Sequence, residues 1–204
     1  MAPPPAPVPK DRCLPTPMGC LCILFIIVVA FGMLLFAVYD NSSHPKLPYF
    51  GVESASLNSL TMNGSRLSGE WNINLTFTNP NNGWNEASYN TICVSILYNN
   101  EHNPSLLAST QLAPFSKKDD ATVLKQVQFK MDLHDAEIER SFSCGAVNFE
   151  IEMSTSVRFT GAFDFRKDYS LKVLCNPLTI KLSPGSSKWA LAQGLTCQTT
   201  TTSG

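Results

Sequence analysis

The feature that most constrains this chain is an apolar segment, "GCLCILFIIVVAFGMLLFAVY", at residues 19–39. Its 21 residues carry no charge, and a helix of that length spans about 31 Å, the thickness of a bilayer core. A cleaved secretory signal has a shorter apolar core, of roughly 7–15 residues, and a cleavage site of small residues. Here Tyr39, Asp40 and Asn41 follow instead. We therefore predict an uncleaved signal anchor, with Tyr39 at the membrane interface.

The segment before the anchor, residues 1–18, is rich in proline. Seven of the chain's fourteen prolines fall within its first seventeen residues. Each proline removes a hydrogen-bond donor and fixes φ, so we expect an extended, disordered tail. Pro4 and Pro7 have the spacing of a PxxP ligand, and an ordinary solvated tail is the simpler interpretation.

Charge and sequons indicate how the anchor is oriented. Lys10 and Arg12 precede it, whereas Lys46 is the first basic residue after it, so the positive-inside rule places the N-terminus in the cytosol. Three N-glycosylation sequons follow the anchor, and their acceptors are Asn41, Asn63 and Asn74. We predict a type II protein whose C-terminal part is luminal or extracellular.

Composition argues against catalysis and nucleic-acid binding. Charged residues make up 15% of the chain and the net charge is −1, which gives no electrostatic footprint for nucleic acid. His44, His102 and His134 lack the spacing of metal ligands, and no nucleophile elbow or phosphate loop is present. We expect no enzyme activity, no cofactor and no metal.

The region after the anchor reads as strands. In "WNINLTFT" the apolar residues Trp71, Ile73, Leu75 and Phe77 alternate with polar ones, as in an antiparallel sheet with one wet face, where Asn74 also lies. Similar runs are "TICVSILY", "SLLASTQLA", "ATVLKQVQFK", "VNFEIEMS", "SVRFTGAFDF" and "YSLKVLC", with a polar loop at 114–120 and one short helix near "LHDAEIERSF". At least seven strands predict a two-sheet antiparallel β-sandwich at 48–198, after a linker at 40–47 and before a disordered tail at 199–204.

The cysteines divide at the anchor. Cys13, Cys20 and Cys22 lie before it or at its start, and are either palmitoylation sites or small apolar fillers. Cys93, Cys144, Cys175 and Cys197 follow it, and in an oxidising compartment four cysteines allow three full pairings.

The order of several short motifs resembles the plant NDR/HIN-like (harpin-induced-like) family, membrane proteins with a late embryogenesis abundant type 2 domain. The resemblance covers about residues 19–197. It rests on Asn79-Pro80-Asn81, Tyr89, Pro114-Phe115, Val157-Arg158-Phe159, and the cysteine pair Cys175 and Cys197. The chain departs from the family in two ways: it has Tyr89-Asn90 where Tyr-Asp is usual, and the preceding loop is about one residue longer.

The resemblance implies a fibronectin III-like sandwich at the plasma membrane, type II topology, and a non-enzymatic role in plant defence or stress signalling. Protein partners are implied without identity, and self-association is left open. A lipid-handling sandwich at the membrane surface is the alternative. The resemblance also implies a Cys175–Cys197 disulfide, which would enclose 21 residues. Cys93 and Cys144 then either pair with each other or remain two free thiols, one of them buried.

The residues themselves give Asn79-Pro80-Asn81 a structural reading. Pro80 disfavours helical backbone at Asn79 and ends the strand, and Asn81 readily bonds its own backbone. We expect a turn that joins two strands, with a partner-binding loop as the alternative.

Overall fold

The computed structural model describes residues 17–63, 66–81, 86–99, 104–118, 122–134, 136–161, 165–182 and 188–202. The proline-rich residues 1–16, with Cys13, lie outside this part of the chain. The chain divides into two compact units, Met1–Asn41 and Ser42–Gly204. Each unit is described by itself below.

The first unit is built around one helix, α1 (Pro17–Ser43). Its segment Gly19–Asp40 is long and apolar enough to cross a membrane, with a mean hydropathy of 3.2 and none of it buried. The helix is longer than the predicted 19–39 at both ends. Proline is tolerated in a first helical turn, so Pro17 does not block the start, and Pro45 disfavours helical backbone before it, so the helix stops at Ser43.

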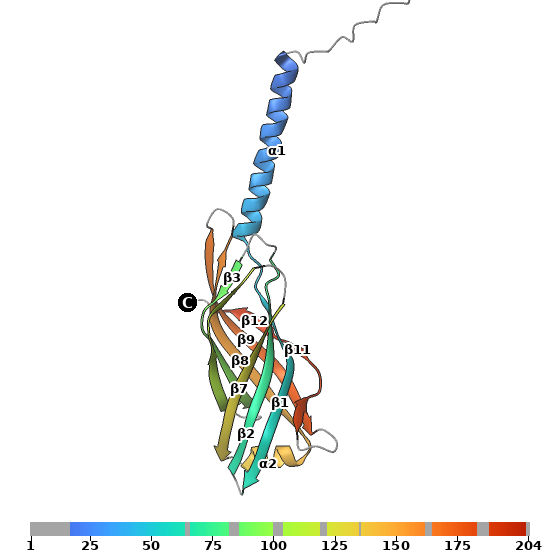
Figure 1. Ribbon diagram of the computed structural model, residues 1–204, viewed down its shortest axis with the longest axis vertical. Coiled ribbons are helices and arrows are strands. Elements are labelled where there is room, and N and C mark those ends of the chain that lie inside the picture. Colours follow the sequence, from blue (N-terminus) through green and yellow to red (C-terminus); the bar gives the residue numbers. More distant parts are fainter. Residues whose placement is uncertain are drawn as a thin grey trace, which may run out of the picture. The chain divides into compact units, whose positions relative to one another are not determined.

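The second unit is an antiparallel β fold with one short helix (Figure 1). The elements are β1 (Tyr49–Asn63), β2 (Arg66–Thr78), β3 (Glu86–Tyr89), β4 (Ile92–Asn99), β5 (Pro104–Leu112), β6 (Phe115–Lys117), β7 (Thr122–His134), α2 (Ala136–Ser143), β8 (Ala146–Thr160), β9 (Arg166–Leu182), β10 (Trp189–Leu191), β11 (Leu195–Thr196) and β12 (Gln198–Thr201). The predicted all-β class and the short helix are therefore confirmed.

The strands form one hydrogen-bonded path in the order β5-β4-β8-β9-β10-β1-β2-β7. The two end strands, β5 and β7, pack against each other, so the sheet is nearly closed, as in a sandwich or a flattened barrel. This arrangement is consistent with the predicted β-sandwich, although the sequence did not indicate how its two layers are joined. The three-residue strand β10 pairs with β9 on one side and with β1 on the other.

Strand alternation places the core where the sequence predicts it. Trp71, Ile73, Leu75 and Phe77 on β2 are all buried, and the polar residues between them lie on the outer face. Burial of such a continuous apolar face is the main favourable term in folding. The same alternation runs through β8, from Val147 to Phe159.

Two predicted irregular segments turn out to contain strands. Part of the polar loop at 114–120 forms β6, which pairs with β3. Part of the disordered tail at 199–204 forms β12, which pairs with β9 from Leu171 to Leu174. Both strands are too short for periodicity to reveal them.

The helix α2 closes one end of the β domain, which we call the capped end. Its Ile138 and Phe142, four residues apart on one helix face, are buried. The Phe142 ring lies 5.0 Å from that of Trp189 and 6.0 Å from that of Phe149, between ring centroids. This end of the core is therefore sealed by apolar packing.

Candidate interaction site at the tethered end of the domain

The other end of the β domain receives the chain that comes from α1, and we call it the tethered end. It comprises residues 44–48, Asn79–Asn81, β3, β6 and the adjoining ends of β7, β8 and β9. Nearly all of the motif residues named in the sequence lie here. Its geometry is the basis for the functional argument.

Asn81 holds the incoming chain through both of its side-chain groups. The backbone N–H of Lys46 donates to Asn81 Oδ1 at 2.8 Å, and Asn81 Nδ2 donates to the carbonyl oxygen of Lys46 at 2.9 Å. The side-chain amide thus bonds Lys46 in the way a neighbouring strand would bond it. Asn81 is 7% exposed, so these bonds lie in a place where an unpaired amide would be costly.

Asn79 orients Asn81 and extends the connection to β6. Its Oδ1 accepts hydrogen bonds from Asn81 Nδ2 at 2.7 Å and from the Asn81 backbone N–H at 3.2 Å, which is an Asx turn across Pro80. Asn79 Nδ2 donates to the carbonyl oxygen of Lys117 at 3.4 Å. Asn79 is completely buried. We call this set of bonds, from Lys46 through Asn81 and Asn79 to Lys117, the asparagine clamp.

The clamp changes the interpretation of the Asn79-Pro80-Asn81 motif. The expected turn is present, because Asn79 and Asn81 bond each other across Pro80. However, the motif also fixes a segment 35 residues earlier in the chain. The two asparagine side chains use hydrogen-bonding groups internally that a partner-binding loop would present to solvent.

Four aromatic rings pack beside the clamp. Phe77 lies 5.4 Å from Phe50, 5.9 Å from Tyr89 and 5.2 Å from Phe115 in edge-on contacts, measured between ring centroids. Tyr89 and Phe115 stack at 4.7 Å with an interplanar angle of 22°. Such pairs contribute about 0.5–1.5 kcal/mol each beyond the burial of their area. Tyr89 and Phe115 of the motif set therefore stabilise this end of the core.

The Tyr89 hydroxyl is unusual within this cluster. Tyr89 is 2% exposed, and its hydroxyl has no hydrogen-bond partner in the part of the chain that the structure describes. Burial in this apolar setting raises the pKa of Tyr89 well above its ordinary value, because the phenolate would be poorly solvated. The phenol stays neutral at any physiological pH.

The remaining motif residues have structural positions. Val157 and Phe159 are buried on β8 beside β3, and Pro114 is exposed just before β6. Arg158 points outward and makes a two-point ion pair with Asp168, at 2.8 and 3.0 Å. That pairing lowers the pKa of the Asp168 carboxyl.

The position that departs from the family pattern is also engaged. Asn90 Nδ2 donates to Ser156 Oγ at 2.6 Å, and the Asn90 backbone N–H donates to the Ser156 carbonyl oxygen at 3.0 Å. An aspartate here would lack the amide donor, since a carboxylate only accepts. Asn90 thus keeps β3 and β4 fixed to β8.

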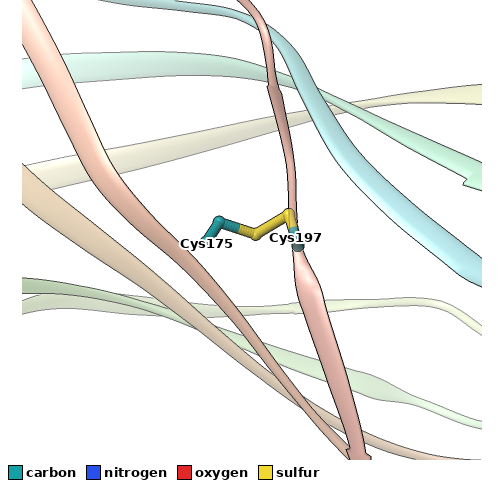
Figure 2. The surroundings of a disulfide bond; sticks show 2 residues. All are labelled: Cys175 and Cys197. Atoms are coloured by element: carbon teal, nitrogen blue, oxygen red, sulfur yellow. A yellow bond between two sulfur atoms is a disulfide. The ribbon is translucent and has the colours of Figure 1, made fainter.

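The structure contains the Cys175–Cys197 disulfide, with an S–S distance of 2.01 Å (Figure 2). Cys175 is buried on β9, and Cys197 lies between β11, which pairs with β1, and β12, which pairs with β9. The bridge therefore fixes the final segment where it crosses from one strand to the other. Cys93 and Cys144 are both free and exposed, so the alternatives of a second bridge and of one buried thiol are wrong.

The three sequon asparagines occupy different settings. Asn74 lies on the outer face of β2, where its Nδ2 donates to Ser54 Oγ at 2.9 Å. Asn63 is exposed at the end of β1. Asn41 lies in the last turn of α1, and its side chain is outside the described part of the structure. Glycosylation of all three stays a prediction.

Three lysines that the sequence analysis did not single out lie at the tethered end. Lys117, Lys125 and Lys167 occupy inward positions of their strands, because their register partners Ala87, Leu75 and Phe159 are all buried. Each lysine is only half-buried, so its ammonium group reaches the rim of the core. The sequence contains a signal for these inward positions, because all three lysines continue the apolar alternation of their strands.

Comparison with protein-family models and with curated proteins gives no match for this chain. Within the described ranges, no group of three His, Cys, Asp or Glu side chains is placed to hold a metal ion.

Proposed function

We propose that this chain is a non-enzymatic, single-pass plasma-membrane protein of the NDR/HIN-like type. In this proposal α1 is a signal anchor, residues 1–18 are cytosolic, and the β domain is extracellular and acts in defence or stress signalling through protein partners. The observation that carries the proposal is the pairing of one fully unburied apolar helix with a disulfide-bonded β domain whose incoming chain is clamped.

The helix supports anchoring because it lacks the burial of a core helix. An apolar helix that serves a soluble core would bury one face, whereas none of the 22-residue segment Gly19–Asp40 is buried. The disulfide supports a position for the β domain outside the cytosol, since thiols in the cytosol are kept reduced.

The clamp supports a structural rather than a chemical role for the motif residues. Asn81 directs its side-chain amide to Lys46, three residues after the last helical residue, Ser43. These bonds fix the incoming chain at Lys46 to the β domain. This is useful for a protein that presents a binding surface, and it needs no catalytic group.

Topology is the first test. The full-length protein expressed in plant cells should shift in mobility after glycosidase treatment, and the shift should vanish when Asn41, Asn63 and Asn74 are all replaced by Gln. In sealed microsomes the C-terminal tail should resist added protease until detergent is present. Digestion of that tail in intact vesicles would reverse the proposed orientation.

A second test separates interaction from catalysis. Proximity labelling from the β domain in intact tissue should recover a reproducible set of extracellular or membrane proteins. A labelling pattern indistinguishable from that of an unrelated membrane-anchored protein would contradict the proposal.

A further inference from the structure

Lys117, Lys125 and Lys167 form a half-buried basic rim at the tethered end. β6, β3, β8 and β9 lie side by side here, and their register places Lys117 beside Ala87, then Phe159, then Lys167. Lys125 enters from β7, with its Nζ 4.6 Å from the centroid of the Phe115 ring. Lys167 Nζ lies 5.7 Å from the centroid of the Tyr169 ring.

The rim is electrostatically unbalanced within the described residues. Four salt bridges lie among the described residues, and none of them includes a rim lysine. They pair Arg66 with Asp132, Lys118 with Glu86, Arg158 with Asp168, and Lys172 with Glu152. The inward positions of the described strands at this end hold aromatic and aliphatic side chains and these three lysines, and no carboxylate. An aromatic face positions an ammonium group but leaves its three donors available.

Chain length limits what the rim can reach. Lys46 follows Ser43 by three residues, which cannot span more than about 11 Å, and Lys46 is bonded to Asn81, which is linked through Asn79 to the backbone of Lys117. If α1 crosses a bilayer, as proposed above, the tethered end is kept within a short chain length of the lipid headgroups. Aromatic rings and lysines are the side chains that favour this interfacial region.

We propose that the basic rim binds phosphate groups of phospholipids in the bilayer that anchors α1. The inference rests on the proposed membrane anchoring. The three ammonium groups would donate hydrogen bonds to phosphate oxygens, while the rings of Phe115 and Tyr169 position the ammonium groups of Lys125 and Lys167. An inward lysine can instead serve only to discourage an edge strand from pairing with another chain, as on β6 and β7. If that were their only role, no lipid would lie at the rim, and the three lysines would react with an acetylating reagent as readily in a bilayer as in detergent.

The test uses the full chain and its own lysines. The protein is placed either in maltoside micelles, which carry no phosphate, or in nanodiscs that contain phosphatidylglycerol, and lysine acetylation rates are measured by mass spectrometry. Lys117, Lys125 and Lys167 should each react roughly fivefold more slowly in nanodiscs, from about 1 kcal/mol per lysine near an anionic surface. The exposed Lys130, Lys172 and Lys181 are internal controls and should change less than about twofold.

A pair of matched variants completes the test. Replacing Lys117, Lys125 and Lys167 by Gln should reduce the number of phospholipids that stay bound to the protein after detergent extraction. The same change at Lys130, Lys172 and Lys181 should not. Equal acetylation rates for the rim lysines in micelles and nanodiscs would overturn the inference. Failure of the protein to enter nanodiscs would instead contradict the anchoring proposal, so the two failures are distinguishable.

Discussion

The two ends of the β domain close the same core by opposite means. At the capped end, α2 inserts the apolar side chains of Ile138 and Phe142. At the tethered end, the buried polar side chains of Asn79 and Asn81 bond backbone groups. Apolar packing is strong but non-directional, whereas hydrogen bonds add little net stability and specify geometry. The comparison indicates that one end serves stability and the other fixes where the incoming chain lies.

The largest effect should come from the capped end. Phe142→Ala removes a buried ring that contacts Trp189 and Phe149, and should lower the free energy of unfolding by about 3–5 kcal/mol. Chemical denaturation of the full chain in detergent measures this. Arg140→Ala, an exposed change on the same helix, should stay within about 0.5 kcal/mol. Similar losses for both would mean that α2 does not seal the core.

The disulfide should have the next largest effect. Replacing both Cys175 and Cys197 by Ala removes a bridge with a sequence separation of 22 and should cost roughly 3 kcal/mol through greater freedom of the unfolded chain. Cys93→Ala, at an exposed free thiol, is the control and should be nearly neutral. An unchanged denaturation midpoint in the double variant would show that β10–β12 hold the final segment without the bridge.

The clamp itself should contribute less stability than either. Asn81→Ala leaves the N–H and carbonyl of Lys46 without their partner and should cost about 1–3 kcal/mol. Asn72→Ala, a partly exposed asparagine on the outer face of β2, is the matched control and should change stability by less than about 0.5 kcal/mol. Pro80→Ala should cost only about 1 kcal/mol, mainly through the unfolded chain. A cost for Asn81→Ala no larger than that for Asn72→Ala would remove the distinction between the two ends.

Replacing Tyr89 should have the smallest effect on the free energy of unfolding, and that effect should depend on pH. The folded-state pKa of Tyr89 is raised above its ordinary value. The contribution of Tyr89 to the free energy of unfolding is therefore complete below about pH 10. It is lost as the pH rises further, because the phenol ionises more readily in the unfolded chain. Tyr89→Phe removes a hydroxyl that lacks a partner and should be neutral or slightly stabilising at pH 7. Between pH 9 and about 11.5, the free energy of unfolding should fall more steeply with pH for the wild type than for the variant. Equal slopes would contradict this.

Strand identity was predictable from sequence, and strand connection was not. Alternation such as that of Trp71, Ile73, Leu75 and Phe77 is a local signal. The joining of the two halves of the sheet depends on β10, three residues whose pairing partners are distant in sequence. Likewise, the Asn79-Pro80-Asn81 turn followed from residue type, but the bond to Lys46 involves a backbone group that no motif marks.

The lysine rim was missed for a different reason. A lysine within an apolar alternation is normally taken as a break in the pattern, yet Lys125 and Lys167 keep the inward phase of β7 and β9. Their long stems bury methylene groups while the charge reaches the rim. A lysine in phase with the core-facing residues of its strand is therefore a signal that sequence analysis can use.

Hydrogen exchange at the Lys46 amide tests the asparagine clamp most directly. In the wild-type protein this amide should exchange slowly, because it donates to the buried Asn81 Oδ1 at 2.8 Å. In Asn81→Ala it should exchange near the rate of an unstructured linker, while amides of β2 keep their protection, and Asn72→Ala should leave it slow. Fast exchange at Lys46 in the wild type, or slow exchange that persists in Asn81→Ala, would contradict the claim that Asn81 holds the incoming chain.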